Sequence, residues 1–333
     1  MQKNVVGTDV NQVRLMNLTD IHGQPQVVNK LKVDIRAYFN MRSTGESSSS
    51  PFGPVILSGP VGCGKTTVAK VLHAELGNLN LIETNGVIVN NKAERNSILL
   101  DADENTTIFI DECQALNIKT QQILLTALTE RTLRVPAGTS HYHTIPLANF
   151  TMVMATTHEY LLLPALIERM RIHCRFKDYS VEDIAEIVRQ RLRCLNWQCE
   201  SDEVLQIIAK RAKRNPRQAL HRNLQMCWHV TKSRDCDRNV ISIEDTHAAF
   251  CYLQIDELGL NPLDRNYLTM LHEYGQSTLG VLSAKLSLPP LTIQRVVEPY
   301  LLKENFIIKD KSSVRVITQK GRKHIESTSF PSN

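Results

Sequence analysis

The sequence lacks the long apolar segments that membrane insertion or export requires. None of its 333 residues falls in a run of 18 apolar residues, which argues against a transmembrane helix. Residues 1–11 also lack the apolar centre of a secretory signal peptide. Hydrophobic residues make up 42% and charged residues 22% of the chain, which excludes a disordered or fibrous protein. We therefore expect a cytoplasmic, globular chain of two or three domains.

Closely spaced cysteine pairs are missing as well. The eight cysteines include no Cys-x-x-Cys motif, so free buried thiols explain them better than zinc or disulfides. His141 and His143 offer two ligands on one face of a strand, but no third ligand lies near them in the sequence. The sequence therefore argues against a cysteine- or histidine-based metal centre.

The net charge of +5 is concentrated near the C-terminus. Residues 303–326 contain three acidic residues and seven basic ones, namely Lys303, Lys309, Lys311, Arg315, Lys320, Arg322 and Lys323. A basic element of this kind suggests a phosphate backbone as partner. A solvated basic tail explains the charge alone equally well.

Hydrophobic patterns predict an α/β domain in residues 13–179, after a disordered N-terminus at 1–12. Short apolar β-rich runs alternate there with helical patterns, which is typical of a parallel sheet covered on both faces. The predicted strands are 55–57, 81–83, 107–110 and 150–155, and a helical pattern covers 18–40. The connection before the last strand is too long for a simple loop, which predicts an inserted hairpin at about 132–148.

Two further domains are predicted in the C-terminal half. A capping box begins at Ser180, and helical patterns continue through a small all-α domain at 180–255. Residues 256–326 have the order helix, helix, helix and two-stranded hairpin, which indicates a winged helix-turn-helix, and 327–333 form a disordered tail. A winged helix binds DNA or packs against protein, and the nearby basic residues favour DNA.

A complete phosphate-binding motif lies at residues 59–66. Gly-Pro-Val-Gly-Cys-Gly-Lys-Thr matches G-x-x-x-x-G-K-[ST], follows a predicted strand and precedes a helix. The glycines let backbone N–H groups face phosphate oxygens at the N-terminus of that helix. We expect Lys65 to reach the β and γ phosphates of ATP and the Thr66 hydroxyl to bind Mg²⁺.

Residues 108–112 predict the second half of this site. The apolar strand ends at Asp111, and ligands bind open parallel sheets at the carboxyl ends of strands. Asp111 is expected to hold Mg²⁺ through water, and Glu112 to orient or deprotonate the attacking water. Two acids after a strand are more often a helix cap, so this interpretation depends on the phosphate-binding motif.

These motifs resemble the AAA+ ATPases, and residues 13–325 resemble the RuvB family of Holliday-junction branch migration motors. The resemblance implies an α/β P-loop domain with a parallel sheet, an all-α lid domain and a winged helix-turn-helix domain. The P-loop is specific only to the superfamily, whereas Asp-Glu-Leu-Gly at 256–259 and Glu-Pro-Tyr-Leu at 298–301 are more specific. The other matching strings are Gly23-Gln24, Ile110-Asp111-Glu112, Ala155-Thr156-Thr157, Asn215-Pro216-Arg217 and Asp264-Arg265.

The resemblance also implies individual roles at the nucleotide. Thr157 is expected to bond the γ-phosphate or water, Arg217 to sense the γ-phosphate from the lid, and Arg169 to reach a neighbouring subunit as an arginine finger. Cations at these places stabilise charge that develops in the transition state. The remaining implied ATP contacts are Val13 and Arg14 at the adenine, Tyr179 beside the base, and Gly59, Gly62, Cys63, Gly64, Thr67, Thr129, Glu130, Arg131 and Pro216.

Several positions depart from the family pattern. The family motif Leu-Arg-Asp-Arg-Phe retains only Arg169 of its two arginines, and Arg171 is a candidate replacement. The lid motif has Arg214 and Asn215 where the family has Gly and Thr. The family's wing motif Arg-Thr-Pro-Arg-Gly-Arg becomes Lys-Asp-Lys-Ser-Ser-Val at 309–314. Candidate DNA contacts are Lys309, Lys311 and Arg315, although Arg315 falls one residue late and on a strand would face the other way.

The resemblance implies partners too. The hairpin matches the RuvB element that docks on RuvA, and we favour an apolar docking patch of Leu133, Val135, Ile145 and Leu147 over folding of these side chains onto their own domain. A homo-oligomeric ring, expected to be a hexamer, would act on four-way junctions and duplex DNA in recombination, repair and the SOS response. A RuvC-like resolvase is a further possible partner, and no membrane is involved.

Two other functions remain open. A clamp-loader-like or initiator-like AAA+ ATPase is disfavoured by the RuvB-type winged helix after the lid. A nucleotide-dependent DNA-binding assembly module with weak hydrolysis is disfavoured by the retained Lys65, Asp111, Glu112 and Arg169. The altered finger and lid motifs keep this last alternative open.

Overall fold

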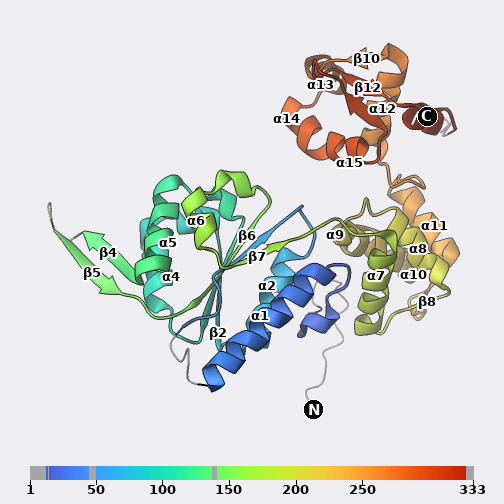
Figure 1. Cartoon of the computed structure of the whole chain (residues 1–333). Coiled ribbons are helices and arrows are strands. Elements are labelled where there is room, and N and C mark those ends of the chain that lie inside the picture. The colour runs from blue at the N-terminus through green and yellow to red at the C-terminus, as the bar shows by residue number, and fades with distance from the viewer. Residues whose placement is uncertain (1–12, 14, 45–49, 137–140, 328–333) are drawn as a thin grey trace. The chain divides into compact units, whose positions relative to one another are not determined.

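The computed structural model describes residues 13, 15–44, 50–136 and 141–327, which form two compact units (Figure 1). The first unit contains the described residues up to Leu195 together with Arg214–Gln218. The second contains Asn196–Lys213 and the described residues from Ala219 onward. Of the helices in these residues, none is long and apolar enough to cross a membrane.

A five-stranded parallel sheet forms the centre of the first unit. Its strand order is β2-β3-β6-β1-β7. The strands are β1 (Val55–Ser58), β2 (Asn80–Asn85), β3 (Thr106–Asp111), β6 (Thr151–Thr156) and β7 (Ile172–Arg175). The four predicted strands are confirmed, whereas β7 was not predicted. It lies at the edge of the sheet, where only Ile172 and Cys174 are fully buried, so it has no continuous apolar run.

Helices cover both faces of this sheet, with α1 and α2 on one face and α4, α5 and α6 on the other (Figure 1). On the second face, Leu99, Leu124 and Leu166 pack with strand residues such as Ile108 and Met154. The helices are α1 (Pro25–Ser43), α2 (Lys65–Leu76), α4 (Lys92–Asp101), α5 (Ile118–Glu130) and α6 (Pro164–Arg169). The helix expected from residue 18 is interrupted, because a separate 3-10 turn at Leu18–Asp20 precedes Pro25.

Short helical turns follow three of the strands at their carboxyl ends. They are α3 (Gly86–Val89) after β2, η3 (Cys113–Ala115) after β3 and η4 (Glu159–Leu161) after β6. Helix α7 (Val181–Leu195) closes the first unit, and its predicted capping box is present. Asp183 N donates to Ser180 Oγ at 3.0 Å, while Ser180 N donates to the Asp183 carboxylate at 3.3 Å.

The inserted hairpin is present, but its apolar side chains face their own domain. It consists of the antiparallel strands β4 (Thr132–Pro136) and β5 (Tyr142–Pro146). Leu133 and Leu147 are buried in the same apolar cluster as α5 and β6, and Val135 packs against that cluster. The expected docking patch is therefore wrong for these leucines, whereas Ile145 is half-buried. The hairpin instead exposes polar and aromatic side chains, namely Arg134, Tyr142, His143 and Thr144.

The second unit begins with a helical part. Trp197 and Trp228 stack face to face in it, with ring centroids 3.8 Å apart. Its helices are α8 (Asp202–Lys210), a π-helical segment at Ala219–Leu224, α10 (Gln225–Arg234) and α11 (Ile243–Tyr252). A pair of two-residue strands, β8 (Gln198–Cys199) and β9 (Val240–Ile241), was not predicted, because segments this short carry no period.

The end of the second unit is the predicted winged helix. Tyr267, Leu282, Leu301 and Phe306 are among the residues of its buried core. Its elements are α12 (Pro262–Tyr274), β10 (Gln276–Ser277), α13 (Leu279–Leu286), a third helix from α14 (Pro290–Thr292) through Ile293–Val297 to α15 (Glu298–Lys303), β11 (Ile307–Lys309) and β12 (Arg315–Ile317). A further helix, α16 (Gln319–Ser327), was not predicted. Its last residue, Ser327, is therefore helical and does not belong to the expected disordered tail.

We expect Leu133→Ala to lower the free energy of unfolding of the first unit by about 2–5 kcal/mol, because it leaves a cavity in the core. Tyr142→Ala is the control, since this side chain on the same hairpin is 67% exposed. It should change the free energy of unfolding by less than about 0.5 kcal/mol. Urea unfolding followed by circular dichroism would measure both. Wild-type stability of Leu133→Ala would place this leucine outside the core.

Candidate nucleotide-binding site

The P-loop encloses the ammonium group of Lys65. This side chain is only 7% exposed, and its Nζ donates to Gly59 O at 2.9 Å and to Pro60 O at 2.8 Å. A buried ammonium needs such acceptors, because removing an unpaired charge from water is costly. The loop therefore holds a positive charge at the N-terminus of α2, where phosphates bind favourably.

The lid segment at Asn215 lies directly against the P-loop. Gly62 has φ +76°, and a Cβ atom there would lie 2.4 Å from Asn215 Oδ1, so only glycine fits. Asn215 Nδ2 donates to Val61 O at 3.0 Å, and its Oδ1 accepts from Arg217 N at 2.9 Å. These bonds place α9 (Pro216–Gln218) beside the loop. The sequence motif includes Asn215 but does not predict its positioning role, because its partners at Gly62 and Val61 are distant in the chain.

Tyr179 contacts the P-loop from a different segment. Its hydroxyl donates to Cys63 O at 2.8 Å, and burial raises the pKa of this hydroxyl, so it remains a donor at neutral pH. The ring leaves no room for a side chain at Gly23, where a Cβ atom would lie 2.4 Å from it. Of the expected adenine contacts, Arg14 lies outside the described residues and Val13 is half-buried.

The two residues expected to bind Mg²⁺ lie side by side. Thr66 at the start of α2 donates its hydroxyl proton to Asp111 Oδ2 at the end of β3, at 2.8 Å. The other carboxylate oxygen of Asp111 accepts from Glu112 N at 2.8 Å. Hydroxyl and carboxylate oxygens are the hard ligands that Mg²⁺ prefers. The chemistry of the pair therefore fits this ion.

Glu112 leaves the sheet in a strained backbone conformation and is hydrogen-bonded to Gln114, which no sequence motif singles out. Its φ is 48°, in the left-handed region where non-glycine residues cluster at functional sites. Its exposed carboxylate accepts a hydrogen bond from Gln114 Nε2. The Oε1 atom of Gln114 accepts from Thr156 Oγ1 at 2.8 Å and from Thr157 N at 3.4 Å. Gln114 is missed by motif reasoning because its partners at 156 and 157 are distant in the chain.

Thr157 lies at the same edge of the sheet as the P-loop and Glu112. These three follow the neighbouring strands β6, β1 and β3, whose carboxyl ends meet because all pairings are parallel. The Thr157 hydroxyl shares a hydrogen bond of 2.8 Å with His158 Nδ1. The structure therefore gathers Lys65, Asp111, Glu112 and Thr157 from separate segments.

The arginine expected to act as a finger lies at the opposite end of the strands from the P-loop, where β7 begins. Arg169 ends α6, just before β7, and Arg171 N donates to Pro54 O immediately ahead of β1. Burial lowers the pKa of the Arg131 guanidinium, and the nearby charges of Arg171 and Arg169 lower it further. Within the described part of the chain, neither Arg169 nor Arg171 has a side-chain hydrogen bond or ion pair. Thr129 and Glu130 belong to this end of the strands too, since they precede Arg131.

The cations expected to contact DNA are partly committed inside the winged helix. Arg315 is only 4% exposed, and its Nε donates to the fully buried Glu298 at 2.7 Å. Lys309 and Tyr267 donate to the same carboxylate at 2.6 and 3.0 Å. The expected DNA contact at Arg315 is therefore wrong, because its guanidinium faces the core. Lys311 is exposed on the turn between β11 and β12.

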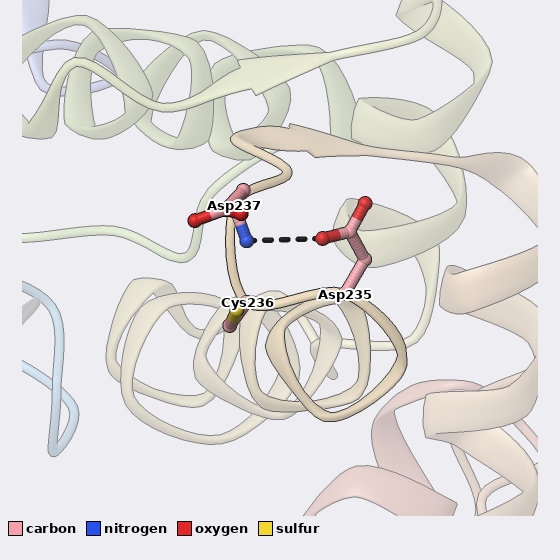
Figure 2. A group of neighbouring side chains, drawn as sticks. All are labelled: Asp235, Cys236 and Asp237. Carbon is pink, nitrogen blue, oxygen red and sulfur yellow. Dashed lines mark hydrogen bonds between the residues drawn. The ribbon is translucent and has the colours of Figure 1, made fainter.

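One exposed group of potential metal ligands occurs among the described residues, at Asp235, Cys236 and Asp237 (Figure 2). The Asp235 carboxylate already accepts from Asp237 N at 3.0 Å, which is the hydrogen bond of an Asx turn. Nothing else in the loop indicates an ion, and we assign no site to it. The eight cysteines are free, but the expectation that they are buried is wrong for Cys194, Cys236 and Cys251, which are exposed, and Cys199 is half-buried.

Comparisons with known proteins agree with this arrangement. Residues 13–176 match the model of the Holliday junction DNA helicase RuvB P-loop domain, and residues 257–326 match the RuvB C-terminal winged helix domain. The Holliday junction branch migration complex subunit RuvB of Wolbachia sp. subsp. Brugia malayi is 32% identical over 317 residues, which is 94% of this chain and 93% of that protein. The chain belongs to the RuvB family.

Other members of the RuvB family show the same similarity. The RuvB subunit of Ehrlichia canis is 32% identical over 321 residues, covering 94% of this chain and 93% of that protein. The structure described as the Thermotoga maritima RuvB Holliday junction branch migration motor has a TM-score of 0.77 and 28% identity, covering 94% of this chain and 98% of that chain. The expected fold class, a P-loop domain with parallel sheet, a helical region and a winged helix, is confirmed.

The buried carboxylate of Glu298 makes the stability of this RuvB winged helix depend on its cations. Burial alone would raise the pKa of Glu298, but hydrogen bonds from Arg315 and Lys309 outweigh burial and hold the pKa below its usual range. We expect Arg315→Ala to destabilise the winged helix by about 3–5 kcal/mol at pH 7, because the carboxylate stays buried with fewer partners. Amide hydrogen exchange in β11 and β12 of the full chain would measure this loss.

Acid should weaken the same interaction. Because the folded pKa of Glu298 is lowered, its stabilisation is present above the unfolded pKa of about 4.3 and is lost as pH falls through the folded value.

Lys311→Ala is the control for Arg315→Ala. It should leave amide hydrogen exchange unchanged and flatten the log–log salt dependence of DNA binding by about one unit. Unchanged exchange in Arg315→Ala would contradict the assigned ion pair.

Proposed function

We propose that this chain hydrolyses ATP to ADP and phosphate and uses the free energy to drive branch migration of Holliday junctions, the process that names its relatives. The observation that carries this proposal is one edge of the sheet. The groups that phosphoryl transfer to water requires meet there, namely Lys65, the Thr66–Asp111 pair and Glu112. The RuvB-type winged helix in the same chain supports DNA as the substrate of the motor.

Each residue at this edge has a proposed part in hydrolysis. Lys65 places its ammonium at the β and γ phosphates, and Glu112 orients the attacking water. Thr157 donates to the γ-phosphate or to that water, and Arg217 approaches from α9. Mg²⁺, held by Thr66 and through water by Asp111, would neutralise charge on the phosphate oxygens. These roles need no covalent intermediate, because positioning and electrostatic stabilisation account for the reaction.

We further propose that each ATP site is completed by a neighbouring copy of the chain. Arg169 is separated from the P-loop of its own chain by the sheet, since it precedes β7 whereas the P-loop follows β1. An arginine that lies on the far side of the sheet from its own P-loop serves as a finger only in another subunit. The proposed assembly is a closed ring, with a hexamer as the preferred number. Thr129, Glu130 and Arg131 lie at this same edge and would contact ATP from that side.

The partners are proposed from the exposed surfaces and from the family. Four-way junction and duplex DNA would contact the wing through Lys311 and through Lys309, whose side chain is 34% exposed. A RuvA-like junction-binding protein would dock on the exposed face of the β4–β5 hairpin, which includes Arg134 and Tyr142. A RuvC-like resolvase would join the junction later in recombination and repair.

We expect Lys65→Ala and Glu112→Gln to fail at different steps. Lys65→Ala removes the charge at the phosphates and should weaken ATP binding. Glu112→Gln should bind ATP within about threefold of wild type but turn over at least about 100-fold more slowly, because only the water is misplaced. Fluorescent-nucleotide titration and single-turnover hydrolysis would separate the two steps. Equal loss of ATP binding in both variants would contradict these roles.

The motor itself is tested with a synthetic four-way junction and a RuvA-like protein. Wild-type chain should separate the junction into duplexes only with ATP and Mg²⁺, and both variants should fail. If hydrolysis is rapid but junction DNA does not stimulate it and no branch point moves, the chain is not a motor. Binding without measurable hydrolysis would instead favour the assembly module.

We expect Arg169→Ala to bind ATP normally and to be inactive alone. Mixed with Lys65→Ala, it should regain part of the hydrolysis, because a Lys65→Ala subunit supplies the finger that completes an intact P-loop in its neighbour. Steady-state turnover across mixing ratios would measure this complementation. If Arg169→Ala keeps wild-type turnover, the finger is another residue, and Arg171 in the same cluster is the next to test.

A further inference from the structure

The amide of Gln114 joins two parts of the proposed active site that are far apart in the chain. It lies in η3, two residues after Glu112 and more than 40 residues before the end of β6. One end of the amide is bonded to the Glu112 carboxylate, and the other is bonded to the hydroxyl of Thr156 and the backbone N–H of Thr157. A single side chain thus connects the proposed water-orienting group with the residues expected to face the γ-phosphate.

The chemistry of the neighbours allows only one orientation of this amide. A carboxylate accepts hydrogen bonds and a backbone N–H donates them, so Nε2 must face Glu112 and Oε1 must face Thr157. The flipped amide would place oxygen against oxygen at Glu112 and N–H against N–H at Thr157. The side chain therefore links Thr157 to the Glu112 carboxylate in one defined geometry.

The turn that carries Gln114 is itself held in place on its other side. Gly86 lies against it so closely that a Cβ atom would be 2.6 Å from Glu112 O. Asn90 Nδ2 donates to Ala115 O at 2.8 Å, and Asn117 N donates back to Asn90 Oδ1 at 2.8 Å. With the turn fixed against α3, a shift of Thr157 acts on the Gln114 side chain rather than on its backbone.

We propose that Gln114 is a positioning residue that couples the end of β6 to the carboxylate of Glu112. When a contact such as that with the γ-phosphate moves Thr157 relative to Gln114, the position of the Glu112 carboxylate changes. Hydrolysis therefore starts only once this contact with the end of β6 has formed. This inference rests on the proposed ATP hydrolysis and specifies how that site is regulated. It requires no contact between Gln114 and the nucleotide.

Two substitutions at this position separate coupling from packing. Gln114→Ala removes all three hydrogen bonds of the amide and should lower kcat by about tenfold or more, with the ATP Kd within about threefold of wild type. Gln114→Glu keeps the shape but places a second carboxylate against Glu112, so it should lower kcat at least as much. A purely structural role predicts near-wild-type kcat for this isosteric variant.

The pH profile of Gln114→Glu gives an independent readout. Protonation of the introduced carboxyl restores a donor to Glu112, so its kcat relative to Gln114→Ala should rise as pH falls. Gln122→Ala, at an exposed glutamine on α5, is the matched control and should keep wild-type kcat and Kd. Urea unfolding would show whether Gln114→Ala remains folded, and Gln114→Glu tests the same bonds if it does not.

A double-mutant comparison tests whether Gln114 acts through Glu112. In a Glu112→Gln background, Gln114→Ala should lower single-turnover hydrolysis by less than about twofold, because the group it positions is already lost. A further tenfold loss, or wild-type kcat in both Gln114 variants, would overturn the coupling. If the wild-type chain shows no Mg²⁺-dependent hydrolysis, the proposed function is overturned, and this inference is overturned with it.

Discussion

Parallel pairing of β1 with β6, and of β6 with β3, is the constraint on which the rest of the site depends. It forces the segments after these strands to one edge of the sheet, where Lys65, Asp111 and Thr157 meet. Together with the parallel pairing of β7 with β1, it places the segments before β6 and β7 at the other end of the strands, where Arg131, Arg169 and Arg171 lie. Under the proposed finger role of Arg169, the two halves of one site lie at opposite ends of the strands and meet only through head-to-tail contact between subunits, which closes into a ring when the rotation between subunits closes.

Buried charge is the second organising feature, and it acts differently in the two units. In the P-loop, Lys65 is held by carbonyl oxygens, which are weak enough partners for phosphate oxygens to compete with them. In the winged helix, Arg315 is bonded to a carboxylate that is fully buried, so this cation is committed to the fold. Only the first arrangement leaves a charge available for a ligand, although the sequence shows a basic residue in each place.

Sequence patterns predicted the elements whose information is local. The P-loop, the apolar strands and the order of the winged helix each depend on residues close in the chain, and the structure confirms the fold that they imply. The exceptions depend on distant partners. Arg315 on β12 was assigned to DNA because its partner Glu298 lies on a different element, helix α15, and Gln114 was missed because it bonds to the end of β6. Leu133 was assigned to a partner surface on the strength of the family resemblance, because strand alternation places Leu133 and Val135 on one face but does not show whether that face packs on its own domain.

A motor must convey events at the phosphates to the part that holds DNA, and the path of the chain provides one covalent route. Asn215 and Arg217 belong to the unit that contains the P-loop, whereas the residues on both sides of Arg214–Gln218 belong to the unit that ends in the winged helix. Lys213 and Arg214, where the chain crosses, have φ values of 50° and 58° in the left-handed region. Residues other than glycine rarely adopt this conformation, so each of the two residues at the crossing carries backbone strain of about 1–3 kcal/mol. This strained crossing comes directly before the segment that carries Arg217, and the chain returns to the second unit between Gln218 and Ala219.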